Sequence, residues 1–409
     1  MDISRRELIA AAGGLLASGA HALPLAVGRP SFPLMLDFTN DIYVHDGASI
    51  GPLSSFTTAT RSTIANMDDL SGLWTPFKAN VARRSNKGLR AETARTNICL
   101  WNRDQTNAVW TRTGVTAAKD QIGIDGAANA ASSLTATEAG GTSLQSIADA
   151  SQARVQSAFV RRLAGSGPVA MTMDGGATWT DIAVTPTWTQ LKIPGQTLAN
   201  PVVGFRIATA GDAIAVDAVQ NENDNTGDFA TAPIFTTSVP VERDIDLLRI
   251  TEPSIFADVF RQPQLTVLLE FVRFTVIPGG NLFNLSDGTL DNRYTYNFNS
   301  ATSSNGFSGL TIASAGKKDG FDPLAQKVDT PGKVYRFAGA TDQVANKVCV
   351  ALNGGTKNYR NSAWPAPSAF DTIEIGELND GGPMCAYLRK LWATPKFLDA
   401  SVLAGLTSA

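Results

Sequence analysis

Short segments that alternate apolar and polar residues decide the fold: VQSAFV at residues 155–160, VAMTM at 169–173, TWTQLKI at 187–193, VVGFRI at 202–207 and AIAVDAV at 213–219. A period of two places every other side chain on the same face of a β-strand. Turn signals separate the segments, among them Asp174-Gly175-Gly176 and Pro194-Gly195. Strands and turns at such even spacing are typical of an antiparallel sandwich, so residues 91–240 are predicted to form one jelly roll.

A second block, at residues 250–409, shows the same pattern. Its candidate strands are residues 265–277, 281–288, 293–298, 333–337, 347–352 and 387–392. One of them runs into Asn353-Gly354, a dipeptide that two-residue hairpin turns favour. Asp399 is placed to cap a short C-terminal helix. We therefore predict an all-β fold of two consecutive antiparallel β-sandwiches, preceded by an extended N-terminal segment at residues 23–90.

The chain has 409 residues, enough for two or three domains. Lys and Arg number 34 against 37 Asp and Glu, for a net charge of -3. The charged fraction of 17% is well below the ~25% of ordinary soluble domains. Polar, uncharged residues occur in place of the missing charged ones, as they do in the loops of β-sandwiches. Because no basic block is present, nucleic-acid binding is not expected.

Residues 1–22 have the parts of an export signal. Arg5-Arg6 precedes an uncharged run at residues 10–20, and Ala20-His21-Ala22 follows as an A-x-A cleavage site. The paired arginines resemble a twin-arginine signal. The run is too short to span a bilayer, which takes ~20 apolar residues. The alternative is an uncleaved Ala/Gly-rich segment that anchors the protein to a partner, and the sequence leaves both open.

Histidine and cysteine are scarce. His45 is the one imidazole outside the signal-like segment, so catalytic triads have a single candidate base and multi-His metal sites have none. We interpret His45 as a loop residue. Cys99, Cys349 and Cys385 are interpreted as small core residues, with a Cys349–Cys385 bridge as the alternative.

Exposed aromatic rings are the first candidates for a binding site, since sugars stack on them. Trp179 follows a turn and Trp364 lies in a Pro-rich stretch, so both are expected to be exposed and are the candidate ligand contacts, with exposed rings that bind no ligand as the alternative. The segments around Trp110, Trp188 and Trp392 alternate in the manner of strands, which favours the core for these three.

An oxygen-rich stretch at residues 221–228 is the candidate metal site. Glu222, Asp224 and Asp228 are predicted calcium ligands, because hard cations take several oxygens from a flexible loop. The stretch lacks the EF-hand spacing, and a solvated loop without metal is the alternative. Residues 287–292 form a weaker instance. No cofactor is predicted to be required.

Hydrolysis of a glycan requires two carboxylates on one face, ~5.5 Å apart in retaining enzymes. The clustered acids are Asp371, Glu374 and Glu377. Their spacing of three places the first two on opposite faces of a strand. We therefore predict no catalytic residue and a protein that is not an enzyme.

Several motifs resemble a module common in structural proteins of tailed phages and prophages. They are ETARTNI at residues 92–98 and NAVWTR at 107–112, which precede a carbohydrate-binding-module-like jelly roll in that family. FNLSDG at 283–288 and YLRKLW at 387–392 are similar to the concanavalin A-like lectin/glucanase sandwich that often follows. The resemblance covers most of the chain, and the signal-like N-terminus departs from it.

The resemblance implies a virion appendage of the tail-fibre or head-fibre type that binds host-surface glycans without hydrolysing them. Its partners would be other virion proteins, and the expected assembly is a homotrimer, because avidity strengthens weak sugar contacts. Two alternatives remain: a bacterial carbohydrate-binding protein exported to the periplasm or the extracellular space, and a glycan hydrolase. No membrane span is expected.

Overall fold

The computed structural model describes residues 31–223, 229–275, 280–298, 308–322, 328, 330–376 and 384–408. The signal-like or anchoring segment at residues 1–22 lies outside these ranges. The described strands pair into antiparallel sheets, which confirms the predicted all-β class. No helix in the described ranges is long and apolar enough to cross a membrane.

The first sandwich consists of two sheets. The larger contains β9 (Arg95–Asn97), β11 (Val115–Gln121), β12 (Ala131–Ala136), β14 (Gln152–Ala164), β17 (Thr189–Leu198), β19 (Ala213–Glu222) and β20 (Val241–Arg243). The smaller contains β10 (Thr111–Thr113), β13 (Gly141–Ser146), β15 (Val169–Thr172), β16 (Thr180–Ile182) and β18 (Val202–Ile207). Val160 and Val216 of one sheet pack with Met171 and Phe205 of the other in a shared core. The alternating segments all form strands, as predicted, but residues 155–160, 169–172 and 213–219 are buried on both faces rather than on one.

One predicted turn is wrong. Pro194 and Gly195 lie inside β17, where the register with β14 shifts: Gln156 pairs with Ile193, and Arg154 pairs with Gln196. The two residues therefore form a β-bulge. Because β17 lies at the end of its sheet, the missing N–H of proline costs no ladder hydrogen bond.

The second sandwich also has two sheets. One contains β1 (Leu34–Asp37), β2 (Ile42–His45), β3 (Ala48–Ser49), β7 (Arg84–Ser85), β8 (Gly88–Ala91), β22 (Gln264–Arg273), β27 (Val334–Asp342), β28 (Lys347–Leu352), β29 (Gly355–Tyr359) and β31 (Ala386–Thr394). The other contains β4 (Thr57–Thr60), β21 (Leu247–Ile250), β23 (Gly280–Ser286), β24 (Arg293–Phe298), β25 (Ser308–Ser314), β26 (Lys317–Phe321) and β30 (Thr372–Ile375). Val267 and Leu269 pack with Phe283 and Tyr296 between them.

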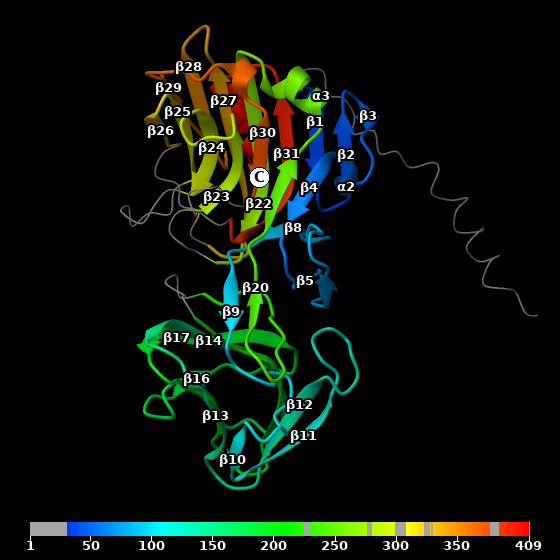
Figure 1. The fold of residues 1–409 in the computed structure, drawn as a ribbon, viewed down its shortest axis with the longest axis vertical. Coiled ribbons are helices and arrows are strands. Elements are labelled where there is room, and N and C mark those ends of the chain that lie inside the picture. Colours follow the sequence, from blue (N-terminus) through cyan, green and yellow to red (C-terminus); the bar gives the residue numbers. More distant parts are fainter. Residues whose placement is uncertain are drawn as a thin grey trace, which may run out of the picture. The chain divides into compact units, whose positions relative to one another are not determined.

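The region at residues 23–90, predicted to be an extended segment, contributes strands from Leu34 onward to both sheets of the second sandwich. Leu36 of β1 pairs with Leu391 of β31, and Leu89 of β8 pairs with Leu388 of the same strand. Figure 1 shows the blue strand β1 beside the red strand β31. A separate hairpin, β5 (Ala65–Asp68) with β6 (Trp74–Phe77), lies between these strands in sequence.

In the part of the chain that the structure describes, helices are few and short. They are α2 (Leu53–Phe56), α3 (Pro253–Ile255), the π-helix η1 (Phe256–Phe260), the 3-10 turn η2 (Pro367–Ala369) and α4 (Ala400–Thr407). The Asp399 carboxylate accepts from the backbone N–H groups of Ser401 and Val402, so the predicted cap of α4 is confirmed. The predicted turn is confirmed too, since Asn353 and Gly354 have φ values of 46° and 87° between β28 and β29.

The three cysteines are buried and carry free thiols. The alternative of a Cys349–Cys385 bridge is therefore wrong, and the interpretation of small core residues holds. Burial raises the pKa of the Cys385 thiol to about 12, which keeps it protonated and unreactive at neutral pH.

Candidate functional site

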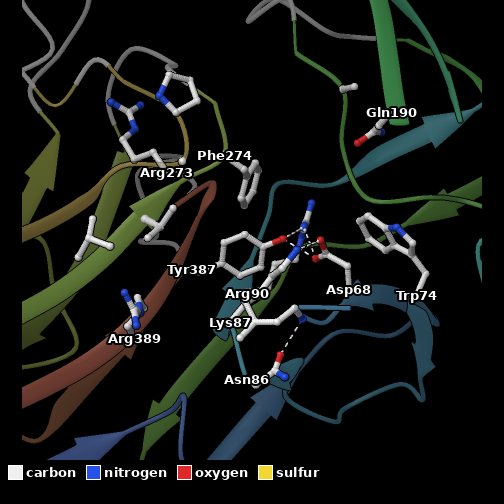
Figure 2. Close-up of a pocket in the computed structure, with 16 residues that line it drawn as sticks. Asp68, Trp74, Asn86, Lys87, Arg90, Gln190, Arg273, Phe274, Tyr387 and Arg389 are labelled. Atoms are coloured by element: carbon white, nitrogen blue, oxygen red, sulfur yellow. Dashed lines mark hydrogen bonds and ion pairs between the residues drawn. The ribbon is translucent and has the colours of Figure 1, made fainter. Parts of the chain in front are cut away.

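A cavity of about 680 Å³ opens where the β5–β6 hairpin, β8 and β31 come together (Figure 2). The end of β22 closes one side, and Gln190 of β17 and Ala230 contribute from the first sandwich. This volume falls within the range of small-molecule and sugar sites.

Cations predominate in the lining. Lys87, Arg90, Arg273 and Arg389 line the cavity together with one carboxylate, Asp68. Behind the lining, Glu92 pairs with Arg90 and Glu270 pairs with Arg389, so the surplus of positive charge is small. The cavity therefore offers mainly N–H donors, the groups that bind hydroxyl and carboxylate oxygens.

Asp68 connects three of the elements around the cavity. Its carboxylate accepts from Lys87 Nζ, from Arg90 Nη1 at 3.3 Å and from the Tyr387 hydroxyl. Tyr387 in turn accepts from Arg90 Nη1. Burial raises the pKa of Tyr387, so its hydroxyl stays protonated and donates to Asp68. The dashed lines in Figure 2 show that these groups hold one another in place.

Aromatic rings form a second part of the lining. Phe274, Tyr387 and Trp74 surround the Arg90 guanidinium, whose carbon lies 4.3, 5.1 and 5.3 Å from the respective ring centroids. Phe274 meets Tyr387 edge to face at 5.5 Å. Phe274 is partly exposed, whereas Trp74 and Tyr387 are mostly buried. Of the three rings, Phe274 is the one best placed to contact a ligand.

A buried ionic cluster holds Arg90, one of the residues that line the cavity, in place. Glu92 is fully buried and accepts from Arg83 Nη1 at 2.9 Å, from Arg90 Nη2 at 2.7 Å and from Arg243 Nη1 at 2.7 Å. Asp246 completes the cluster by pairing with Arg83 and with Arg61. Paired in this way, the buried charges fix the orientation of Arg90 in the cavity wall.

Electrostatics keep the cluster ionised. Burial alone would raise the pKa of Glu92, but the charges of Arg243, Arg90 and Arg83 outweigh it and hold that pKa well below its usual range.

Arg273 lines the cavity outside this cluster. Burial lowers the pKa of Arg273 to about 10, so this lining residue remains a cation at neutral pH.

The two predicted ligand contacts, Trp179 and Trp364, lie elsewhere, and neither lines this cavity. Both are partly buried. Trp179 has the Arg206 guanidinium over its ring at 4.8 Å. Trp364 packs against the core of the second sandwich and donates from Nε1 to Asn346 Oδ1 at 3.3 Å. Their role in binding stays a prediction.

The predicted calcium ligands fall partly outside the described residues, which include neither Asp224 nor Asp228. Glu222 is fully buried at the end of β19, where its carboxylate accepts from the Thr231 hydroxyl and from Thr231 N at 3.1 Å. In the weaker candidate, Asp287 accepts from Thr289 and Asn292 within its own loop. Calcium binding stays a prediction.

The acids considered for hydrolysis are separated by their surroundings. Glu374 lies in β30 and pairs with Arg249 at 2.7 Å, whereas Asp371 is exposed before that strand, and Glu377 lies outside the described residues. His45 is the last residue of strand β2 and is buried, so its interpretation as a loop residue is wrong.

Sequence reasoning missed the cavity because its residues come from distant segments of the chain. The available signal was the run of charges from Arg83 to Glu92, which lies on and beside the short strands β7 and β8. Arg83, Arg90 and Glu92 are all buried there.

The chain matches no family model and no curated protein. Among solved structures, it is similar to the NanB sialidase of Streptococcus pneumoniae, with 15% identity and a TM-score of 0.29 over 35% of this chain and 24% of that one. It is also similar to the CBM40 of the Ruminococcus gnavus IT-sialidase, solved with α2,3 sialyllactose, with 14% identity and a TM-score of 0.30 over 38% of this chain and 86% of that one.

A third likeness is to the binding domain of botulinum neurotoxin serotype D/C, with 12% identity and a TM-score of 0.31 over 40% of each chain. The chain thus spans about a quarter of the sialidase and less than half of the toxin domain. Because these TM-scores are about 0.3, the likenesses carry no argument about function, and the function has to be inferred from the residues of this chain.

Proposed function

We propose that this protein is a non-enzymatic glycan-binding protein of a phage virion appendage, and that the cavity at Arg389 and Phe274 binds the glycan. The observation that carries the proposal is the lining, which combines charged N–H donors with a partly exposed ring in a space of about 680 Å³. Sugars are bound by this combination, since donors bond their oxygens and rings pack on their C–H faces.

The same lining disfavours hydrolysis. Among the described residues around the cavity, Asp68 alone carries a carboxylate, and it is engaged by Lys87, Arg90 and Tyr387. A hydrolase needs a second carboxylate to act as acid or nucleophile. Incubation with host polysaccharide should therefore release no reducing sugar, and release that depends on Asp68 would overturn the non-enzymatic proposal.

Glycan binding is tested with two arginines that share one partner. Arg389 and Arg336 both pair with Glu270 and are 31% and 33% exposed, but only Arg389 lines the cavity. We expect Arg389→Ala and Phe274→Ala to lower binding on a glycan array by about tenfold, a loss of ~1.4 kcal/mol. Arg336→Ala should leave binding unchanged.

Trp179→Ala and Trp364→Ala extend this test to the sites chosen from the sequence. If these two variants lose binding while Phe274→Ala retains it, the glycan site lies at the tryptophans and the cavity proposal is wrong. An array with neutral and carboxylate-bearing sugars further shows whether the cationic lining selects acidic glycans.

The virion setting is supported by the sequence motifs at residues 92–98 and 107–112. The twin-arginine-like segment instead favours an exported bacterial carbohydrate-binding protein. N-terminal sequencing of the mature protein separates the two, because a chain that begins at Leu23 excludes an uncleaved anchor. Light scattering tests the expected homotrimer.

A further inference from the structure

His45, Asp46 and Asp258 bring three ligand atoms within 4.8 Å of one another, and none of the three lines the cavity. His45 ends β2, Asp46 follows it in the turn to β3, and Asp258 lies in the π-helix η1. His45 Nε2 is 3.4 Å from Asp258 Oδ2 and 4.0 Å from Asp46 Oδ2.

The imidazole is the unusual member of this group. His45 is only 9% exposed, and its Nε2 is buried without a hydrogen bond to any described residue. A buried nitrogen in that state is costly unless it has a partner. Because Nε2 faces both carboxylates, the partner it lacks belongs between them.

The distances distinguish a metal site from an ordinary ion pair. A charge-assisted N–H···O bond is ~2.7–2.9 Å long, shorter than the 3.4 Å that separates His45 Nε2 from Asp258 Oδ2. Two ligands bound tetrahedrally at ~2.0–2.2 Å from one zinc ion lie ~3.3–3.6 Å apart. The 3.4 Å between His45 Nε2 and Asp258 Oδ2 matches two ligands of one ion, whereas the 4.0 Å from His45 Nε2 to Asp46 Oδ2 is longer and would have to shorten on metal binding.

The backbone holds all three residues firmly. Asp46 and Gly47 have φ values of 50° and 79° in the turn that pairs His45 with Ala48, and Asp46 N donates to Pro33 O at 2.8 Å. The π-helix is closed by Arg261 N, which donates to Phe256 O at 2.8 Å. Insertions of this kind in helices are frequent at functional sites.

Further negative charge lies close by. Hydrogen bonds from Ser254 lower the pKa of the Glu252 carboxyl, and the nearby His45 lowers it further. Glu252 therefore adds to the field that attracts a cation to His45, Asp46 and Asp258.

We propose that His45, Asp46 and Asp258 bind a divalent first-row transition metal ion such as Zn²⁺, with the remaining coordination position open to water. Imidazole with carboxylates suits Zn²⁺, whereas Ca²⁺ and Mg²⁺ prefer all-oxygen sites. The ion would connect the β2–β3 turn to η1, two distant parts of the chain, and so stabilise the second sandwich.

The test is calorimetric titration of the full chain with ZnCl₂ after treatment with EDTA. We expect one equivalent of Zn²⁺ to bind and to raise the melting temperature, while CaCl₂ and MgCl₂ do neither at this site. His45→Gln and Asp258→Asn should each weaken Zn²⁺ binding by about tenfold or more. Asp181→Asn, which changes an exposed carboxylate outside every candidate metal site, should leave it unchanged.

Asp258 is 49% exposed, so Asp258→Asn should fold normally and give a clear answer even if His45→Gln does not. Absence of Zn²⁺ binding by the wild-type chain, or binding that persists in Asp258→Asn, would overturn the proposal. Because the readout is the metal itself, the outcome is independent of glycan binding.

Discussion

The hydroxyl of Tyr387 donates a hydrogen bond to the carboxylate of Asp68, 319 positions earlier in the chain. This bond joins β31 of the second sandwich to the β5–β6 hairpin at the wall of the cavity. It also shows how the N-terminal region and the C-terminal strand build one site together.

Tyr387→Phe removes this bond and leaves the ring in place. Because the carboxylate of Asp68 is largely buried, we expect a loss of about 1–2 kcal/mol in the free energy of unfolding, measured by urea denaturation. Lys87→Met removes a partner that is 26% exposed, so it should cost less than about 1 kcal/mol. An equal or larger effect of Lys87→Met would contradict this ranking.

Glu92→Gln removes the central negative charge of the buried cluster. Arg83, Arg90 and Arg243 then share too few carboxylates, so we expect a loss of about 3 kcal/mol or more in the free energy of unfolding. The exposed Glu242 is the matched control, and Glu242→Gln should change stability by less than about 0.5 kcal/mol. If Glu92→Gln lowered the free energy of unfolding no more than Glu242→Gln does, the buried cluster would contribute little to stability.

The same carboxyl predicts a dependence on pH. The folded-state pKa of Glu92 lies below its ordinary value of 4.5, so its contribution is present above that pH and is lost as the pH falls toward the folded pKa. The difference in stability between the wild-type protein and Glu92→Gln should therefore be constant well above pH 4.5 and narrow as the pH falls below that value. Chemical denaturation at several pH values measures it, and a difference that stays constant below pH 4.5 would contradict the prediction.

Gly88 is required where β8 meets β31. Its φ is 122°, and a Cβ at this position would lie 2.6 Å from the carbonyl oxygen of Leu388. We expect Gly88→Ala to cost about 3 kcal/mol, because it adds a backbone clash to an unfavourable φ. Gly140 also has a positive φ, at 76°, but has open space around its Cβ position. Gly140→Ala should cost about 1 kcal/mol, and thermal unfolding compares the two.

Trp364 and Trp179 should differ in their effect on stability. Trp364 packs against the main core and makes a hydrogen bond, so we expect Trp364→Ala to cost about 2 kcal/mol. Trp179→Ala removes mainly the contact with Arg206 and should cost about 1 kcal/mol. Differential scanning calorimetry measures both, and a larger loss for Trp179 would mean that its ring is the more important for packing.

Local signals in the sequence were reliable where the chemistry is local. Asn353-Gly354 forms its turn because both residues tolerate a positive φ, and Asp399 caps α4 because its carboxylate reaches N–H groups two and three residues away. The alternating segments form strands because a period of two places apolar side chains such as Val160 and Val216 on the face toward the shared core. Pro194-Gly195 failed as a turn because the partner strand β14 made it a bulge.

The sequence alone therefore determined the all-β class, the positions of the longest strands, the Asn353-Gly354 turn and the Asp399 cap. Only the tertiary structure decided the strand neighbours of residues 34–91, the burial of Glu92 among three arginines, and the approach of Asp258 to His45. The physical reason is that strand propensity and caps depend on residues a few positions apart. The pairing of Leu36 with Leu391 and the pairing of Glu92 with Arg243 instead depend on partners more than a hundred positions away, which no local pattern specifies.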